Sequence, residues 1–294
     1  MTTENKTSQA YFKYLLALLL FGFNGIVAHY ILLSSYEIVF LRTLIGSIFL
    51  IVVFFCSKRE RKSIKNKKHF AYMVVSGMAM GASWMFLYEA YSEVGVSVAT
   101  LAYYCGPVIV ILLSPLLFRE RLTIRKILGF VVVLLGMYFV NGSALRQNGF
   151  SWGLLCGILA AMLYAVMVIF NKKALSIAGI ENAMFQLIFG FLVVTVFMQI
   201  KQGLVIPSLF ENIIPVLILG IVNTGIGCYF YFSAIQKLPA TSVAICGYLE
   251  PVSALIFAGL FLQERLAVIQ IVGAILIIFG ATVGEISTFK SRNG

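Results

Sequence analysis

Long apolar stretches alternate with short polar connections along the whole chain. A helix needs about 20 consecutive apolar residues to cross the hydrocarbon core of a bilayer, and within lipid it must satisfy its own backbone hydrogen bonds. Ten such stretches can be traced, at residues 12–33, 36–56, 69–91, 96–118, 127–141, 152–171, 182–200, 212–235, 241–262 and 267–287. The pattern therefore predicts an all-α integral membrane protein with ten transmembrane helices.

This hydrophobic pattern occurs twice. When residues 1–141 are shifted by 144 positions onto residues 151–294, many polar, glycine and proline positions coincide. The matching pairs include Glu37 and Glu181, Gly46 and Gly190, Gly81 and Gly225, Tyr104 and Tyr248, Pro107 and Pro251, Gly129 and Gly273, Gly136 and Gly280, and the Glu-Arg-Leu triplets at 120–122 and 264–266. Each copy holds an odd number of spans, so the second copy must enter the membrane upside down. We therefore predict one membrane domain of two inverted five-helix repeats, joined by a linker at 141–149, an architecture of secondary transporters.

The distribution of basic residues predicts the orientation. The net charge is +11, and ten spans would put both termini on one side of the membrane. All but four of the 22 Lys and Arg residues then fall on that side, many of them in the loop 57–68; the exceptions are Arg42, Arg146, Lys201 and Arg265. The positive-inside rule makes this side cytoplasmic, in a plasma or inner membrane. The basicity is thus a topology signal with anionic lipid headgroups as partner, and it does not indicate nucleic-acid binding.

Composition narrows the possible functions. Hydrophobic residues make up 61% of the chain and charged residues 11%, against about 45–50% and 25% in soluble domains. There is no phosphate-binding loop ending in Gly-Lys-Ser/Thr, so we expect no direct use of ATP. The chain has no Asp, two His and five Cys without metal-ligand spacing. Paired carboxylates, a metal cluster or an activated nucleophile cannot be assembled from these residues. We expect no enzyme, no metal and no cofactor.

Glu250 is the charged residue deepest within a predicted span. It stands close to the bilayer midplane, where an ionisable group costs about 2.5–3.5 kcal/mol on insertion scales. Pro251 follows and cannot donate to the carbonyl of Gly247, which leaves this oxygen for a ligand or a neighbouring helix. Pro107 holds the matching place in the first copy, so Pro107, Gly247 and Pro251 are predicted helix breaks with a gating role. We interpret Glu250 as a site for a proton or an amine; the alternative is a carboxylate that only packs.

Glu89 is a second candidate, near the outer end of the third span. Trp84 and Tyr88 are four residues apart and share one helix face beside it. Two aromatic rings near a carboxylate suit an organic cation through cation–π contacts. The alternative is an aromatic belt at the membrane interface with a glutamate reaching water.

Three further polar residues interrupt the spans. Arg42 becomes Gln186 in the second copy, which favours a structural arginine that snorkels outward. Asn24 and Asn223 are candidate substrate contacts, with hydrogen bonding between helices as the simpler role.

These motifs resemble the drug/metabolite transporter superfamily, specifically its ten-helix EamA-type members. The resemblance rests on Pro107 with Arg119-Glu120-Arg121-Leu122, on Pro251 with Gln263-Glu264-Arg265-Leu266, on Glu250-Pro251, on Arg42, and on the aromatic segment 229–234. It implies a central cavity lined by helices 1, 3, 4, 6, 8 and 9, with helices 5 and 10 packed at the back. Because a Glu-Pro pair recurs in that family, Glu250 is expected to serve the family's shared mechanism or fold and not to set substrate choice. Glu89 departs from the family pattern and is the candidate for a private substrate contact.

We therefore expect a secondary transporter, an exporter, that moves a small polar organic metabolite by alternating access, with a proton or counter-substrate as coupling partner. Glu37, Glu89 and Glu250 outnumber Arg42 within the spans, so a cavity among them should be net negative where they stay ionised and should favour amino acids or amines over multivalent anions. Burial can protonate some of them, and the alternative for Glu37 is an interfacial position. Trp84, Tyr88 and Tyr104 would add cation–π surface. An integral-membrane enzyme is one alternative, opposed by the missing Asp. A channel or lipid scramblase is another, opposed by the lack of a continuous hydrophilic stripe on any span.

Overall fold

The structure, a computed structural model, describes residues 3–57, 66–141, 151–203, 213–263 and 267–290, which form helices and no strand. In chain order the helices are α1 (Thr3–Gly22), α2 (Asn24–His29), α3 (Ser35–Cys56), α4 (Lys67–Tyr103), α5 (Cys105–Phe118), α6 (Ile124–Asn141), α7 (Trp152–Lys173), α8 (Ile180–Gln202), α9 (Ile213–Leu217), the π-helix η3 (Ile218–Ile226), α10 (Gly227–Ile235), α11 (Ala240–Gly247), α12 (Leu249–Phe261) and α13 (Val268–Lys290). Eight helical stretches of the described residues are long and apolar enough to cross a membrane, and Val268–Gly284 adds a shorter one. The predicted all-helical, multi-pass class is confirmed.

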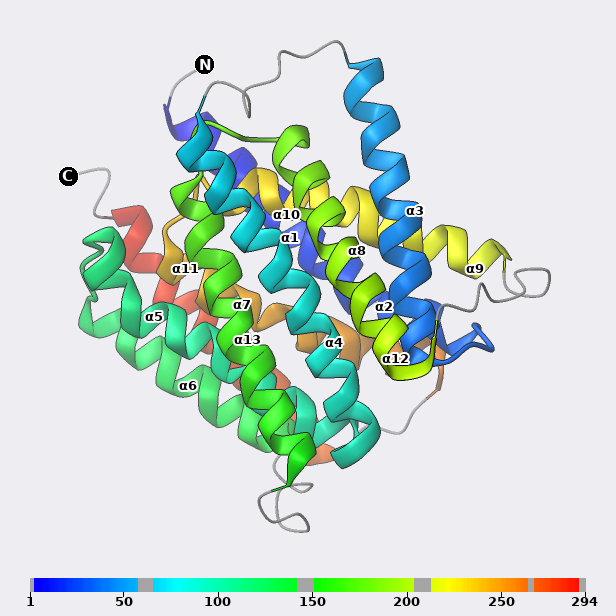
Figure 1. Cartoon of the computed structure of the whole chain (residues 1–294). Helices are drawn as coiled ribbons and strands as arrows, with labels where there is room; N and C mark the ends of the chain where they lie inside the picture. Colours follow the sequence, from blue (N-terminus) through cyan, green and yellow to red (C-terminus); the bar gives the residue numbers. More distant parts are fainter. Residues whose placement is uncertain (1–2, 58–65, 142–150, 204–212, 264–266, 291–294) are drawn as a thin grey trace.

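The helices form a bundle with two distinguishable ends. Figure 1 shows that α1 begins and α13 ends toward the end where α3 ends and α4 begins, which we call the terminal end. α3 and α7 begin at the opposite, distal end, where α8 ends. Most of the predicted basic loop and linker, and the triplet 264–266, lie outside the described residues.

Local signals explain where several helices begin. The Ser34 hydroxyl accepts a hydrogen bond from the Glu37 backbone N–H, and the Glu37 carboxylate accepts one from the Ser34 N–H at 2.8 Å, which forms a capping box. Asn66 and Ser151 cap α4 and α7 in the same way through one side-chain oxygen each. Glu37 is therefore a helix cap at the distal end, in agreement with the interfacial alternative and not with an interior carboxylate.

Several long helical stretches are interrupted. α4 bends at the exposed Gly95, near the junction of the candidate spans Lys67–Val96 and Val98–Phe118, and the φ of 77° suits glycine. Two further interruptions, at tyrosines, lie within the bundle. Tyr104 separates α4 from α5, and Tyr248 separates α11 from α12. Each break comes three residues before a proline, Pro107 or Pro251, that cannot donate to the preceding turn. The predicted interruptions are present, and their part in gating stays a prediction.

Glycines allow α6 and α13 to touch backbone to backbone. A methyl group placed on Gly129 would lie 2.5 Å from the carbonyl oxygen of Gly280, and one on Gly136 would lie 2.6 Å from that of Gly273. The later residue of α6 meets the earlier residue of α13, so the two helices run antiparallel. Small residues permit this close approach in membranes, where van der Waals packing drives helix association.

Candidate substrate site and helix-end clamps

Glu250 lies in the first turn of α12, within the bundle. Its side chain is half-buried. Within the part of the chain that the structure describes, its carboxylate accepts no hydrogen bond. Only its backbone carbonyl accepts one, from the Ser253 hydroxyl at 2.7 Å. A carboxylate within a membrane span that has no protein hydrogen bond is costly, so Glu250 is a candidate to bind a ligand or a proton.

Tyrosines from α1, α4, α7 and α10, and Tyr104 at the break between α4 and α5, form a group near this carboxylate. Five of them lie within its electrostatic range: Tyr14, Tyr91, Tyr103, Tyr104 and Tyr164. The ring centroids of Tyr103 lie 5.5 Å from Tyr104 and 5.6 Å from Tyr164, and the Tyr14 ring lies 5.5 Å from that of Tyr231. We call these six residues, Tyr14, Tyr91, Tyr103, Tyr104, Tyr164 and Tyr231, the tyrosine cluster. They give Glu250 an aromatic wall that suits an apolar or cationic group.

Arg42, on α3, is buried and points inward. Its Nε donates to the Thr224 hydroxyl at 2.9 Å, and its guanidinium lies 4.9 Å from the centre of the Trp84 ring. The prediction that Arg42 snorkels outward was wrong, because Thr224 and Trp84 offer it partners inside the bundle that its own helix cannot supply. Its two terminal amino groups have no hydrogen-bond acceptor among the described residues. Arg42 is also the one charged group found to act on Glu250.

The π-helix η3 supplies two of the polar partners in this region. Thr224 accepts the bond from Arg42, and the Asn223 amide donates to the Leu20 carbonyl at 2.8 Å. π-Helical turns are rare and often mark functional sites. Asn24, at the start of α2, keeps a buried side-chain oxygen without a hydrogen-bond partner among the described residues. Asn223 thus joins helices, whereas the Asn24 oxygen remains open to a ligand.

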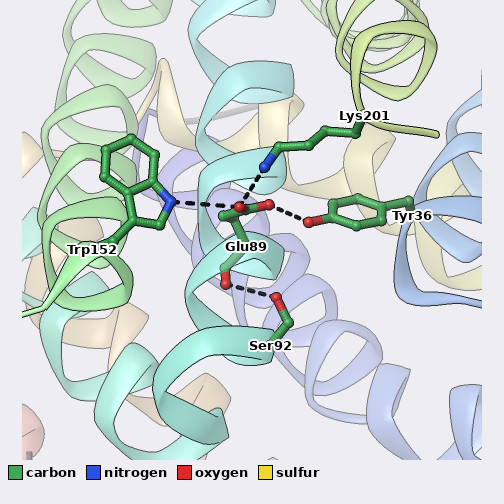
Figure 2. A network of polar contacts seen from close by, with 5 residues as sticks. All are labelled: Tyr36, Glu89, Ser92, Trp152 and Lys201. Atoms are coloured by element: carbon green, nitrogen blue, oxygen red, sulfur yellow. Dashed lines mark hydrogen bonds and ion pairs between the residues drawn. The ribbon is translucent and has the colours of Figure 1, made fainter. Parts of the chain in front are cut away.

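Glu89 is engaged by other side chains at the distal end (Figure 2). Lys201 forms an ion pair with its Oε1 at 2.5 Å, the Trp152 Nε1 donates to the same oxygen at 3.5 Å, and the Tyr36 hydroxyl donates to Oε2. These residues come from α3, α4, α7 and α8. We call them the distal clamp, because one carboxylate joins four helices.

A second group of polar contacts joins helices at the terminal end. The Glu120 carboxylate accepts hydrogen bonds from the Ala240 and Thr241 backbone N–H groups at 2.5 and 3.0 Å, where α11 begins. The Lys126 ammonium donates to the Thr241 hydroxyl at 2.5 Å. The buried Lys172 donates to the carbonyls of Ile235 and Leu238, where α10 ends. Glu120, Lys126, Lys172 and Thr241 form the terminal clamp. Opposite charges here match the dipoles of the two helix ends.

The structure separates the residues that the sequence suggested as a site. Tyr104 lies within electrostatic range of Glu250. The Trp84 ring, however, packs against the Arg42 guanidinium. The Tyr88 ring lies 5.4 Å from the ring of Tyr91. The predicted cation site of Trp84 and Tyr88 beside Glu89 is therefore not formed as a unit. Sequence reasoning missed most of the tyrosine cluster and every partner of Glu89, since these residues are far apart in the chain. The repeated occurrence of tyrosine within apolar spans was the sequence feature that could have indicated the tyrosine cluster.

A separate crevice of about 240 Å³ lies between α3, the start of α8, η3 and α10. Its lining is almost wholly apolar, formed by Phe49, Leu50, Val53, Ser57, Ile180, Ile226 and Tyr229. It offers no carboxylate or basic group that could orient a charged metabolite.

The fold and these contacts define a multi-pass helical membrane protein with buried charges in its interior and a polar clamp at each end. The sequence profile of the EamA-like transporter family matches residues 9–142 and, a second time, residues 151–283. The chain belongs to this family, within the drug/metabolite transporter superfamily, and the predicted family is confirmed.

The names of several related proteins agree with a membrane transporter. The chain is 25% identical over 287 residues to the uncharacterized transporter YxxF of Bacillus subtilis, covering 95% of this chain and 90% of that protein. It is 29% identical to an uncharacterized transporter of Helicobacter pylori, with 85% of each chain covered, and 28% identical to protein PecM of Dickeya dadantii, with 74% and 75% covered. A solved crystal structure with 18% identity superposes with a TM-score of 0.81 over 94% of this chain and 97% of that chain, so it shares the fold.

Proposed function

We propose that this protein is a secondary transporter that carries a small polar organic metabolite, an amino acid or an amine, across the cell membrane by alternating access. One observation carries the proposal: the Glu250 carboxylate is unpaired among the described residues and faces the tyrosine cluster in the interior. A carrier must expose such a site to one side at a time. The distal and terminal clamps join helices through polar side chains at the two ends of the bundle.

We further propose that ten spans form two inverted repeats. The glycine contacts support this arrangement, because the shift by 144 positions exchanges Gly129 with Gly273 and Gly136 with Gly280. Under that exchange the contact between Gly129 and Gly280 becomes the contact between Gly273 and Gly136, which is also present. Equivalent helices that pack antiparallel indicate copies of opposite orientation. Tyr104 and Tyr248, another equivalent pair, have ring centroids 5.6 Å apart, as expected near an approximate two-fold axis.

The orientation can be tested directly. With both termini cytoplasmic, a reporter fused after Lys68 should be cytoplasmic and one fused after Lys201 should be external. The measurement is paired activity of an alkaline phosphatase and a fluorescent protein at each position. Activity of both fusions on the same side would contradict the inverted repeat.

We assign Glu89 to closure of the distal end, since both of its carboxylate oxygens already have protein donors. Opening this end separates α4 from the end of α8, and the bond from Lys201 must then break. The exposed ammonium of Lys201 makes the ion pair weak, of the order of 1 kcal/mol. A weak lock suits a contact that breaks in every cycle.

Charge reversal should loosen the distal clamp. Cys156 is buried and lies within electrostatic range of Glu89 and Lys201, so it is a native reporter when the other four cysteines are serine. Glu89→Lys should raise its labelling rate with a membrane-impermeant thiol reagent about fivefold, as about 1 kcal/mol implies. Combining Glu89→Lys with Lys201→Glu should restore slow labelling. Glu93→Lys on the same helix is the control for charge alone, because Glu93 also acts electrostatically on Cys156 and Lys201 but takes no part in the distal clamp. It should raise the labelling rate much less than Glu89→Lys does. If the labelling rate of Cys156 is the same in all variants, Glu89 does not hold the distal end closed.

Reconstitution in liposomes tests the function itself. Purified protein should support saturable counterflow of at least one compound from a panel of amino acids and amines, because only a carrier exchanges labelled for unlabelled substrate. Leak without saturation, or movement of labelled lipid alone, would favour a channel or a scramblase over a carrier.

A further inference from the structure

The apolar crevice between α3, α8, η3 and α10 has a volume of about 240 Å³ and reaches the terminal end of the bundle. Its lining includes Ser57, the residue after α3, and Ile180, the first residue of α8. The Ser57 hydroxyl already donates to the Phe54 carbonyl at 2.7 Å. The crevice is smaller than a typical ligand pocket of about 300–1,000 Å³ and lacks the several convergent polar groups of such a pocket. It therefore suits a narrow apolar chain better than a polar metabolite.

Two of the helices around this crevice carry exposed apolar side chains. On α3, the exposed side chains are Ile48, Val52 and Phe55, and η3 adds Val222. Both helices belong to candidate membrane spans, so these side chains contact the hydrocarbon of the bilayer. The apolar molecules that surround the crevice are therefore the acyl chains of phospholipids.

Lys13, on α1, places a positive charge beside the crevice. Its ammonium lies 5.4 Å from the centre of the Tyr229 ring, and Tyr229 is one of the lining residues. No carboxylate among the described residues forms an ion pair with this ammonium. Lys13 lies near the beginning of the candidate span Thr7–His29, where a lysine can keep its charge at the level of the lipid headgroups. A free ammonium beside an apolar crevice fits a ligand with an anionic head and an apolar tail.

The local charge also favours an anion. Glu181 is the acidic residue next to the lining in the described part of the chain, and it is only 4% exposed, so it presents little surface charge. The terminal end is the side that the sequence predicts to be cytoplasmic. Anionic phospholipids are characteristic of the cytoplasmic leaflet, and basic pockets between spans on that side bind their headgroups.

We infer that the crevice binds an anionic phospholipid, with one acyl chain between α3, η3 and α10 and the headgroup phosphate on Lys13. The second acyl chain stays in the bilayer, so the crevice needs room for one chain only. None of the lining residues belongs to the tyrosine cluster or to either clamp. The bound lipid is therefore a structural partner and not the transported molecule, and the inference holds whatever metabolite the protein carries.

Native mass spectrometry of the purified full-length protein tests the headgroup contact. The protein is titrated in a non-ionic detergent with phosphatidylglycerol, with phosphatidylcholine of the same acyl chains, and with oleate. At the tightest site we expect phosphatidylglycerol to bind about fivefold more tightly than phosphatidylcholine, the factor that one basic residue contributes near an anionic headgroup. Lys13→Gln should abolish this preference.

Lys68→Gln is the matched control. Lys68 also lies at the terminal end, with its ammonium 5.9 Å from the centre of the Tyr72 ring, but Tyr72 is not part of the crevice. This variant removes the same charge and should keep the preference for phosphatidylglycerol. An equal loss in both variants would overturn the inference, and so would oleate that binds as tightly as phosphatidylglycerol.

A phosphatidylglycerol with a diazirine in its acyl chain locates the chain. After irradiation of the reconstituted wild type, peptide mapping should find adducts in residues 49–57 and 226–229 severalfold above those in other exposed apolar segments. Val53→Phe fills the crevice and should reduce these adducts severalfold, whereas Val52→Phe, at the exposed neighbouring position, should not.

Thermal unfolding of both phenylalanine variants in parallel separates a filled crevice from misfolding. If Val53→Phe does not fold, the wild-type map and the titration of Lys13→Gln still decide. Adducts spread evenly over the exposed helix faces would overturn the inference, as would adducts that Val53→Phe leaves unchanged. A crevice that a second copy of the chain protects from the lipid in a dimer would also overturn it. These measurements need no transport, so a failure of counterflow would contradict the carrier and leave the lipid site standing.

Discussion

Glu250→Gln should reduce substrate counterflow to the level of empty liposomes while the protein still inserts and folds. Glutamine has nearly the same size as glutamate, so the packing around the start of α12 is preserved. It lacks the negative charge, however, and the carboxylate is the negative group of the interior that has no protein hydrogen bond among the described residues. Losing a charge-assisted contact at a desolvated site costs about 1.5–3 kcal/mol, which alone lowers affinity by about one to two orders of magnitude.

Glu93→Gln is the matched control, since Glu93 is an exposed carboxylate on α4. It removes the same charge and should leave counterflow unchanged. Both variants must be compared at equal amounts of reconstituted protein, with thermal unfolding measured in parallel. Normal counterflow by Glu250→Gln would mean that the carboxylate serves packing alone, and a low melting temperature would assign the loss to misfolding.

Gly280→Ala adds only one methyl group, yet it should lower the stability of the folded protein strongly. The added methyl group would lie 2.5 Å from the carbonyl oxygen of Gly129 and 2.9 Å from the backbone nitrogen of Val133. Backbone atoms cannot rotate away, so α6 and α13 must separate, and overpacking of this kind costs about 1–3 kcal/mol. Loss of close contact also weakens the van der Waals packing that drives helix association in a membrane.

Gly25→Ala provides the comparison, because a methyl group there would meet no atom within 4 Å. Thermal unfolding in detergent and abundance in the membrane are the measurements. We expect a clear decrease of the melting temperature for Gly280→Ala and none for Gly25→Ala. Similar melting temperatures for the two variants would show that α6 and α13 are not packed backbone to backbone.

Much of the architecture could be predicted because the bilayer imposes it. Length and apolarity identify most of the spans, since a helix in lipid must satisfy its own backbone. Pro107 and Pro251 predicted helix breaks, and breaks occur at Tyr104 and Tyr248. The capping box of Ser34 and Glu37 could also have been read locally; assigning Glu37 to the interior overlooked the Ser-x-x-Glu pattern.

The sequence by itself determined the membrane class, the family and the helix breaks, because these depend on local chemistry and on the spacing of apolar residues. Only the tertiary structure decided which charges are paired. Lys201 reaches Glu89 across 112 positions of the chain, and Thr224 reaches Arg42 across 182. A side chain on a helix has many possible partners, and the packing of other helices selects one of them. That selection ties Glu89 into the distal clamp, turns Arg42 inward, and leaves the Glu250 carboxylate without a hydrogen bond among the described residues.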